Sequence, residues 1–216
     1  MSDEDLRESV EAVRSLILPL KEGEFSEKLY KVLVYVESIE KNWSAYSSAL
    51  EGLNKEGNPE RRHKLAEAKA RGFEASLKGS LRFARMNLDG AMILALEKVA
   101  RKPKVASKAD EKRKGEALQR AFDGLPDPTK AMREHFRSTS DPLDKYLVAG
   151  PWGHEYLKKR QIETERHYEE LCSALSCEDS AAGKVVLSYG MLNRAIDAVE
   201  GLAVKAAKET GANSIG

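Results

Sequence analysis

The sequence predicts an all-α protein in which long antiparallel amphipathic helices form an elongated bundle. Charged residues make up 33% of the 216 residues and aromatic residues only 6%, a composition that favours long helices over sheets. Apolar residues recur with helical spacing over long stretches. No alternating pattern of useful length indicates a strand. We therefore expect residues 1–210 to form a single helical-bundle domain.

The first expected element is an N-terminal helix within residues 1–22. Ser2 can cap this helix, and the acidic residues 3–5 lie near the positive end of its dipole. Pro19 is expected to end or kink it. One face of the helix is apolar and carries Leu6, Val10, Val13, Ile17 and Leu20.

A long helical hairpin is expected over residues 24–100, with its turn at Gly57-Asn58-Pro59. The apolar residues of its first helix follow the 4-3-4-3 spacing of a heptad seam. They are Phe25, Leu29, Val32, Val36, Ile39, Trp43, Tyr46, Leu50 and Leu53. The stripe of the second helix consists of Ala66, Ala70, Phe73, Leu77, Leu81, Ala84, Leu88, Ala91, Ala95 and Val99.

Residues 101–153 are expected to form a loop-rich connection that contains short helices. Lysines and Pro103 indicate a loop at its start, and Asp127 can cap a helix over residues 128–137. The glycines and proline of residues 150–153 indicate another break.

Residues 154–210 are expected to form a C-terminal pair of helices. The first would extend from about residue 154 to 176, and the second from about 179 to 208 with a returning heptad spacing. Residues 211–216 are expected to be a disordered tail.

The candidate anion-binding residues are clustered, although the formal net charge is only +1. An anionic lipid surface or a nucleic-acid backbone would attract such clusters, whereas the alternative is a solvated lysine-rich loop. The candidates are Lys98, Arg101, Lys102, Lys104, Lys108, Lys112, Arg113, Lys114, Lys158, Lys159 and Arg160. The first eight face only two acids, Asp110 and Glu111, in residues 98–114, so we expect this run not to be neutralised internally.

The heptad seam of residues 25–53 allows two interpretations. Its apolar side chains form either a core within one chain or a self-association surface, because both arrangements remove them from water. The candidate self-association residues are Leu29, Val32, Val36, Ile39 and Trp43. A homodimer is the expected oligomer, and it would also bury the widened apolar patch over residues 30–36.

No motif in the sequence indicates catalysis. The phosphate-binding loop, the nucleophile elbow, the dinucleotide fingerprint and the Cys-x-x-Cys pair are all missing from the sequence. Glu60 and His63 form the single Glu-x-x-His pair, whereas a di-iron bundle needs two. We therefore expect no catalytic residue, no metal site and no cofactor, so the chain is not expected to be an enzyme.

The expected location is the cytoplasm or the periphery of a membrane. The N-terminus is acidic rather than a secretory leader, and no run of 18 apolar residues exists. Cys172 and Cys177 are the two cysteines, and on one helix they would point in different directions, which argues against a disulfide framework.

Three features resemble the BAR-domain superfamily of crescent-shaped, membrane-binding dimers. They are the heptad helix from Phe25 to Leu53, the stretch Asp141-Pro142-Leu143-Asp144-Lys145-Tyr146-Leu147 followed by Lys158-Lys159-Arg160 and His167-Tyr168-Glu169-Glu170-Leu171, and the closing heptad helix. The resemblance implies dimers that bind anionic lipid through residues 158–160 and 98–114, with no catalytic residue. The acidic N-terminus, the Ala-rich helix over residues 60–100 and the short last helix differ from the superfamily pattern.

The sequence therefore favours a non-enzymatic helical scaffold that self-associates and binds anionic membrane surfaces. One alternative is a protein–protein interaction or assembly module without lipid affinity, whose partners are unknown. A nucleic-acid packaging protein ranks lower, because aromatic residues do not interleave with the basic ones and the net charge is near zero. An enzyme ranks lowest.

Overall fold

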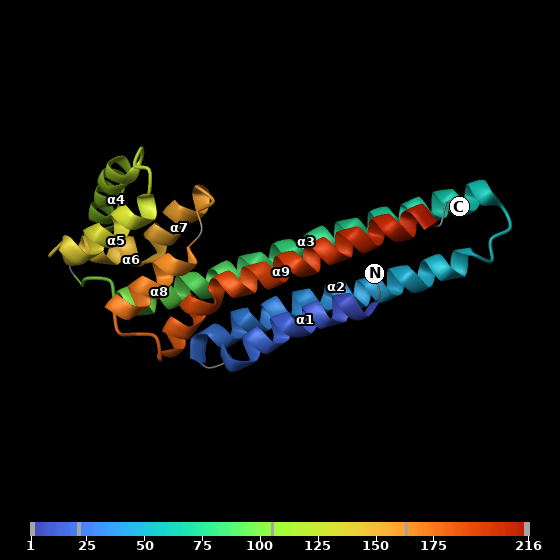
Figure 1. The fold of residues 1–216 in the computed structure, drawn as a ribbon, viewed down its shortest axis with the longest axis horizontal. Helices are drawn as coiled ribbons and strands as arrows, with labels where there is room; N and C mark the ends of the chain where they lie inside the picture. The colour runs from blue at the N-terminus through green and yellow to red at the C-terminus, as the bar shows by residue number, and fades with distance from the viewer. Residues whose placement is uncertain (1–2, 21–22, 105, 163, 214–216) are drawn as a thin grey trace. The chain divides into compact units, whose positions relative to one another are not determined.

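This computed structural model describes residues 3–20, 23–104, 106–162 and 164–213. Every regular element within these ranges is helical, which confirms the prediction of an all-α protein. In chain order the elements are α1 (Asp3–Ile17), the short 3-10 helices η1 (Leu18–Leu20) and η2 (Gly23–Phe25), α2 (Ser26–Leu53), α3 (Pro59–Ala100), α4 (Lys108–Phe122), α5 (Pro128–Ser138), α6 (Pro142–Ala149), α7 (Pro151–Lys159), α8 (Glu165–Ala174) and α9 (Ala181–Asn213). Figure 1 shows them along the chain.

Contacts within the chain group into two compact units, whereas the sequence suggested one domain over residues 1–210. Unit 1 comprises Met1–Leu88 and Met191–Gly216, and unit 2 comprises Asp89–Gly190. Helices α3 and α9 contribute residues to both units.

Unit 1 contains α1, α2 and the larger parts of α3 and α9, and its core follows the predicted apolar spacing. The seam residues of α2 from Leu29 to Leu50 are buried. The last seam residue, Leu53, lies at the end of the helix and is half-buried. The apolar face of α1 packs against α2 and is buried at Leu6, Val10, Val13 and Ile17. The predicted cap of α1, Ser2, lies outside the described residues.

Contacts between α2 and α3 in unit 1 follow a regular order. The Ser38 hydroxyl lies 2.8 Å from that of Ser80, and Asn42 donates to the Ser76 hydroxyl at 2.7 Å. Further along α2, a stack with ring centroids 5.1 Å apart joins Tyr46 to α3 at Phe73. Residue numbers rise along α2 while those of the partners fall along α3, so each turn of one helix meets a defined turn of the other.

Unit 2 is built from short helices, and α4, α5 and α6 begin at side-chain caps. Ser107 accepts a hydrogen bond from the Asp110 amide at 3.1 Å, and Asp127 accepts one from the Lys130 amide at 2.9 Å. Asp141 caps α6 in the same way, and prolines occupy the first turns of α5, α6 and α7. Such caps satisfy amides that a helix start leaves without intrahelical partners. The predicted cap at Asp127 is therefore confirmed.

The core of unit 2 comes from all of these short helices. Met132 of α5 and Leu157 of α7 are fully buried at its centre. The expected loop at residues 150–153 is instead the start of α7, and the Trp152 ring stacks on Tyr156 with centroids 5.4 Å apart. Trp152 is half-buried and packs against this core.

The prediction of a single helix over residues 154–176 is wrong. It is divided into α7 and α8, because Gln161 adopts a left-handed conformation with φ 55° that ends α7. A second such residue, Ser176, follows α8, so Cys177 is not on the helix of Cys172 and its thiol lies 3.6 Å from the Cys172 carbonyl oxygen. The expected disordered tail is also helical as far as Asn213, and residues 214–216 lie outside the described ranges.

Candidate functional site

The five candidate self-association residues lie inside unit 1. Exposed fractions are 0% for Leu29, Val32, Val36 and Ile39 and 5% for Trp43. The Trp43 ring packs edge-on against Phe73 of α3 at a centroid distance of 5.6 Å. The interpretation of the seam as an open self-association surface is therefore corrected, because the same chain covers these side chains.

A different group of apolar side chains on unit 1 is exposed, and we call it the apolar patch. It comprises the exposed residues Tyr30, Val34, Phe83 and Met86 and the half-buried Tyr35. Exposed fractions are 57% for Tyr30, 46% for Phe83 and 55% for Met86. Tyr35 of α2 stacks on Phe83 of α3 with ring centroids 5.2 Å apart, so the two helices share one patch. Aromatic residues and Met are enriched in protein–protein interfaces.

The α2 half of the apolar patch was visible in the sequence, and the α3 half was missed. Residues 30–36 widen the apolar face of α2, and this widening marked Tyr30 and Val34. Phe83 and Met86 lie off the buried stripe of α3, in positions that the helical period assigns to the polar face. Large apolar residues one turn apart on a polar face are the signal that would have identified them.

Many of the candidate anion-binding residues are paired with carboxylates of the same chain. Lys102 pairs with Glu111, and Lys114 pairs with Asp141 and, at 2.9 Å, with Asp144. The pairing has an electrostatic consequence, because the hydrogen bond from Lys114 lowers the pKa of Asp141. Lys102 is thus offset inside the run over residues 98–114 and Lys114 by acids outside it, so fewer bases of this run are available than the sequence suggested.

The second basic cluster is divided among three different carboxylates. Lys158 pairs with Asp89, Lys159 lies 3.8 Å from Glu155, and Arg160 pairs with Asp123. Arg160 also lies over the Tyr156 ring, with its guanidinium carbon 3.8 Å from the centroid. Burial raises the pKa of Asp123, but the hydrogen bonds from Arg160, Gln119 and Tyr156 and the charge of Arg160 together outweigh it, so the net shift is downward. Arg160 is therefore a structural residue of unit 2.

Four candidate bases remain exposed and have no carboxylate within ion-pair distance in the described part of the chain: Arg101, Lys104, Lys108 and Lys112. We call these residues the basic group. Lys108 and Lys112 lie one turn apart on α4. Arg113 is also exposed, and a 3.4 Å contact with Asp110 partly offsets its charge. Lys98 is in the last turn of α3.

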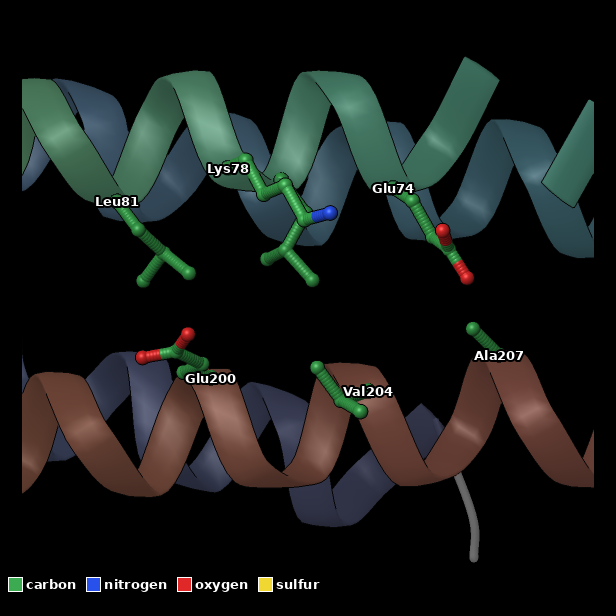
Figure 2. Close-up of a pocket in the computed structure, with 7 residues that line it drawn as sticks. Glu74, Lys78, Leu81, Glu200, Val204 and Ala207 are labelled. Atoms are coloured by element: carbon green, nitrogen blue, oxygen red, sulfur yellow. The ribbon is translucent and has the colours of Figure 1, made fainter. Parts of the chain in front are cut away.

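Unit 1 also contains a shallow pocket of about 200 Å³ between α3 and α9. Figure 2 shows Glu74, Lys78 and Leu81 of α3 facing Glu200 and Val204 of α9. Close by, Arg85 pairs with Asp197 at 2.7 Å and with Glu200 at 2.5 Å. Of the charged residues that line this pocket, Glu200 thus joins α9 to α3.

A comparison of the chain with protein-family models, with curated proteins and with solved structures finds no match in any of the three. In the described ranges, no helix combines the length and the apolar character needed to cross a bilayer. Within the same ranges, no three His, Cys, Asp or Glu side chains are grouped so that they could hold a metal ion.

Proposed function

We propose that this protein is a non-enzymatic helical scaffold that self-associates through the apolar patch of unit 1. The observation that carries the proposal is the exposure of Tyr30, Val34, Phe83 and Met86 on two helices that the Tyr35–Phe83 stack joins. Contiguous apolar side chains in water carry a free-energy cost of roughly 25 cal/mol per Å². A second copy that covered the patch would remove this cost, so the homodimer remains the expected oligomer.

An antiparallel bundle of long helices is the frame that we propose for this scaffold. The opposed numbering of the contacts between α2 and α3 supports it, and so do the contacts from Arg85 of α3 to Asp197 and Glu200 of α9. An elongated form and the crescent of a BAR-like dimer stay predictions. Small-angle scattering with mass determination would test both.

Sedimentation velocity tests the self-association directly. We expect the wild-type chain to sediment as a dimer and Phe83→Glu as a monomer, because the carboxylate would be buried in the interface without a partner. Leu65→Glu is the matched control, since Leu65 is 37% exposed on the same helix and outside the apolar patch. A monomeric wild-type chain at about 100 µM, well above a micromolar dissociation constant, would contradict the proposal.

Anionic surfaces are the second proposed partner, and the basic group carries this part of the proposal. Near an anionic bilayer each Lys or Arg contributes about 1 kcal/mol, so four such residues give reversible binding that salt weakens. A membrane surface is the partner that we propose, with the chain attached peripherally from the cytoplasmic side. Single-stranded RNA, which would attract the same charges, is the competing partner in the experiment.

Co-sedimentation with phosphatidylserine vesicles at low salt tests this binding. The triple variant of Lys104, Lys108 and Lys112 to Glu should lose the binding. A control variant with Lys41, Lys55 and Lys69 changed to Glu alters the net charge equally and should keep it. Equal binding by both variants, or a shift with RNA and none with vesicles, would reject membrane attachment through the basic group.

A further inference from the structure

A pocket of about 470 Å³ lies in unit 2 between α3 and α7, and its walls are mostly carbon. This volume falls within the range of small-molecule sites, which are largely apolar with a few placed polar groups. The lining residues are Asp89, Ile93, His154, Glu155, Lys158 and Lys159. The self-association and surface attachment proposed above make no use of this pocket.

His154 is the buried polar group of the pocket wall. It is only 3% exposed, and its Nδ1 lies 2.7 Å from the Tyr168 hydroxyl. Its Nε2 is buried and has no hydrogen-bond partner. Burial lowers the pKa of His154 to about 4, so the imidazole is neutral at neutral pH. Native proteins rarely leave a buried polar atom unpaired, so Nε2 lacks a partner that a ligand could supply. Because Nε2 has almost no exposed surface, a ligand atom reaches it only after a small shift of the pocket wall.

The proton on this imidazole can be assigned from its partner. Burial raises the pKa of Tyr168 well above its ordinary value of 10.0, so the phenol keeps its proton. Donation of this proton to Nδ1 satisfies the hydroxyl and leaves the N–H of the neutral ring on Nε2. The unpaired group is then a donor, and it calls for an acceptor on the ligand.

Both carboxylate oxygens of Asp89 already have partners within the chain, so Asp89 does not favour a cationic ligand. Its Oδ1 accepts from the Tyr189 hydroxyl at 2.6 Å, and its Oδ2 pairs with Lys158. Lys159 lies at the outer side of the pocket, where its side chain is 75% exposed and its 3.8 Å contact with Glu155 is a weak surface pair. The pocket thus combines a buried N–H donor, the exposed ammonium of Lys159 and an apolar wall that includes Ile93.

We propose that this pocket binds a small organic carboxylate with a compact apolar body. The carboxylate accepts from His154 Nε2 and lies near the ammonium of Lys159, while the apolar body packs against Ile93. A neutral amide of the same shape lacks the charge, and a free inorganic anion lacks the apolar body. Both should therefore bind much more weakly than the carboxylate.

Calorimetric titration of the full chain with benzoate, benzamide and phosphate tests this proposal. We expect benzoate to bind with a dissociation constant below about 1 mM, and benzamide and phosphate at least about tenfold more weakly. Absence of benzoate binding in this range overturns the proposal, and so does equal binding of benzamide.

Two variants place the binding in this pocket. Ile93→Trp fills the pocket from α3 and should abolish binding. Lys159→Met removes the ammonium and should weaken the binding of benzoate severalfold. The matched variant Lys104→Met lies outside the pocket and should leave the affinity for benzoate unchanged. Benzoate binding that survives Ile93→Trp in a folded chain, as judged by circular dichroism, contradicts the proposed site.

The imidazole provides a readout that does not depend on affinity. In ¹⁵N-edited NMR the free chain should show His154 as the neutral Nε2–H tautomer, and benzoate should shift its Nε2 resonance. A ring that carries its proton on Nδ1, or that does not respond to benzoate, would remove the donor on which the inference depends.

Discussion

Unit 1 and unit 2 are both helical, but different features of the sequence specify them. In unit 1 the buried residues repeat along long helices, and the contact of α2 with α3 continues turn after turn from Tyr35 to Tyr46. In unit 2 three of the short helices, α4, α5 and α6, begin at their own side-chain caps, and the core includes the fully buried Met132 and Leu157. A periodic pattern is thus enough to define one unit, whereas single local contacts define the other.

The largest expected difference between the units is their response to acid. Unit 2 buries His154 and His167, and burial lowers the pKa of each from 6.5 to about 4. Because the unfolded chain then binds these protons more tightly, the free energy of unfolding falls as the pH drops from 6.5 toward 4. Each histidine accounts for a loss of roughly 3 kcal/mol at the acid end of this window. The two together should therefore cost several kcal/mol.

Urea unfolding between pH 7 and pH 4 measures this effect. The non-titrating variants His154→Gln and His167→Gln should each flatten the pH dependence above about pH 4. An unfolding free energy that does not change over this range in the wild-type chain would show that the two rings are not held neutral inside unit 2.

The seam of unit 1 is tested by deleting one of its buried side chains. Leu29→Ala removes a fully buried side chain and should cost about 3 kcal/mol of unfolding free energy. Leu65→Ala, at a residue of α3 that is 37% exposed and lies outside the apolar patch, should cost less than about 0.5 kcal/mol. Similar losses from both changes in denaturant unfolding would mean that the seam is not the core of unit 1.

Two glycines in helices should respond in opposite directions to the same substitution. A Cβ on Gly153 of α7 would overlap the backbone carbonyl of Val148, while one on Gly79 of α3 meets open space. We expect Gly153→Ala to destabilise by about 2 kcal/mol because backbone must shift. Gly79→Ala should stabilise by about 0.5 kcal/mol or more, because alanine loses less entropy in a helix. Differential scanning calorimetry would show the opposite shifts in Tm.

The smallest predicted effect concerns a cap of unit 2. Ser107→Ala removes the acceptor for the Asp110 amide and should cost about 1 kcal/mol. Ser107→Asn restores a capping oxygen and should recover most of this loss. Hydrogen exchange of the first amides of α4 would locate the effect, and unchanged exchange in Ser107→Ala would show that the cap is not stabilising.

The sequence predicted the helices of unit 1 well, because their burial is periodic. The stripe of α3 from Phe73 to Leu88 is buried as expected. The breaks in unit 2 could not be predicted in this way, since Gln161 and Ser176 end helices through left-handed backbone that neither residue type favours. Gly150 and Gly153 indicated a loop, but they are required by carbonyls of α6 that approach α7 closely.

The candidate surfaces were predictable only in part, because the sequence does not show which charged residues the fold pairs. Clustering of charge along the chain identified Lys104, Lys108 and Lys112, but it could not show that Lys102 and Lys114 are paired with acids. The partners of Lys114 lie 27 and 30 residues away, so only the fold brings them together. The unpaired nitrogen of His154 has no signature in the sequence at all.

Each unit contains one of the two tryptophans of the chain. Trp43 is buried against Phe73 and Tyr46 in unit 1, and Trp152 stacks on Tyr156 over Gly115 in unit 2. The protein therefore has a built-in optical label in each half. If one tryptophan at a time is replaced by phenylalanine, the fluorescence of the other reports the unfolding of its own unit. Two unfolding curves that do not coincide would reveal an intermediate in which only one unit is folded.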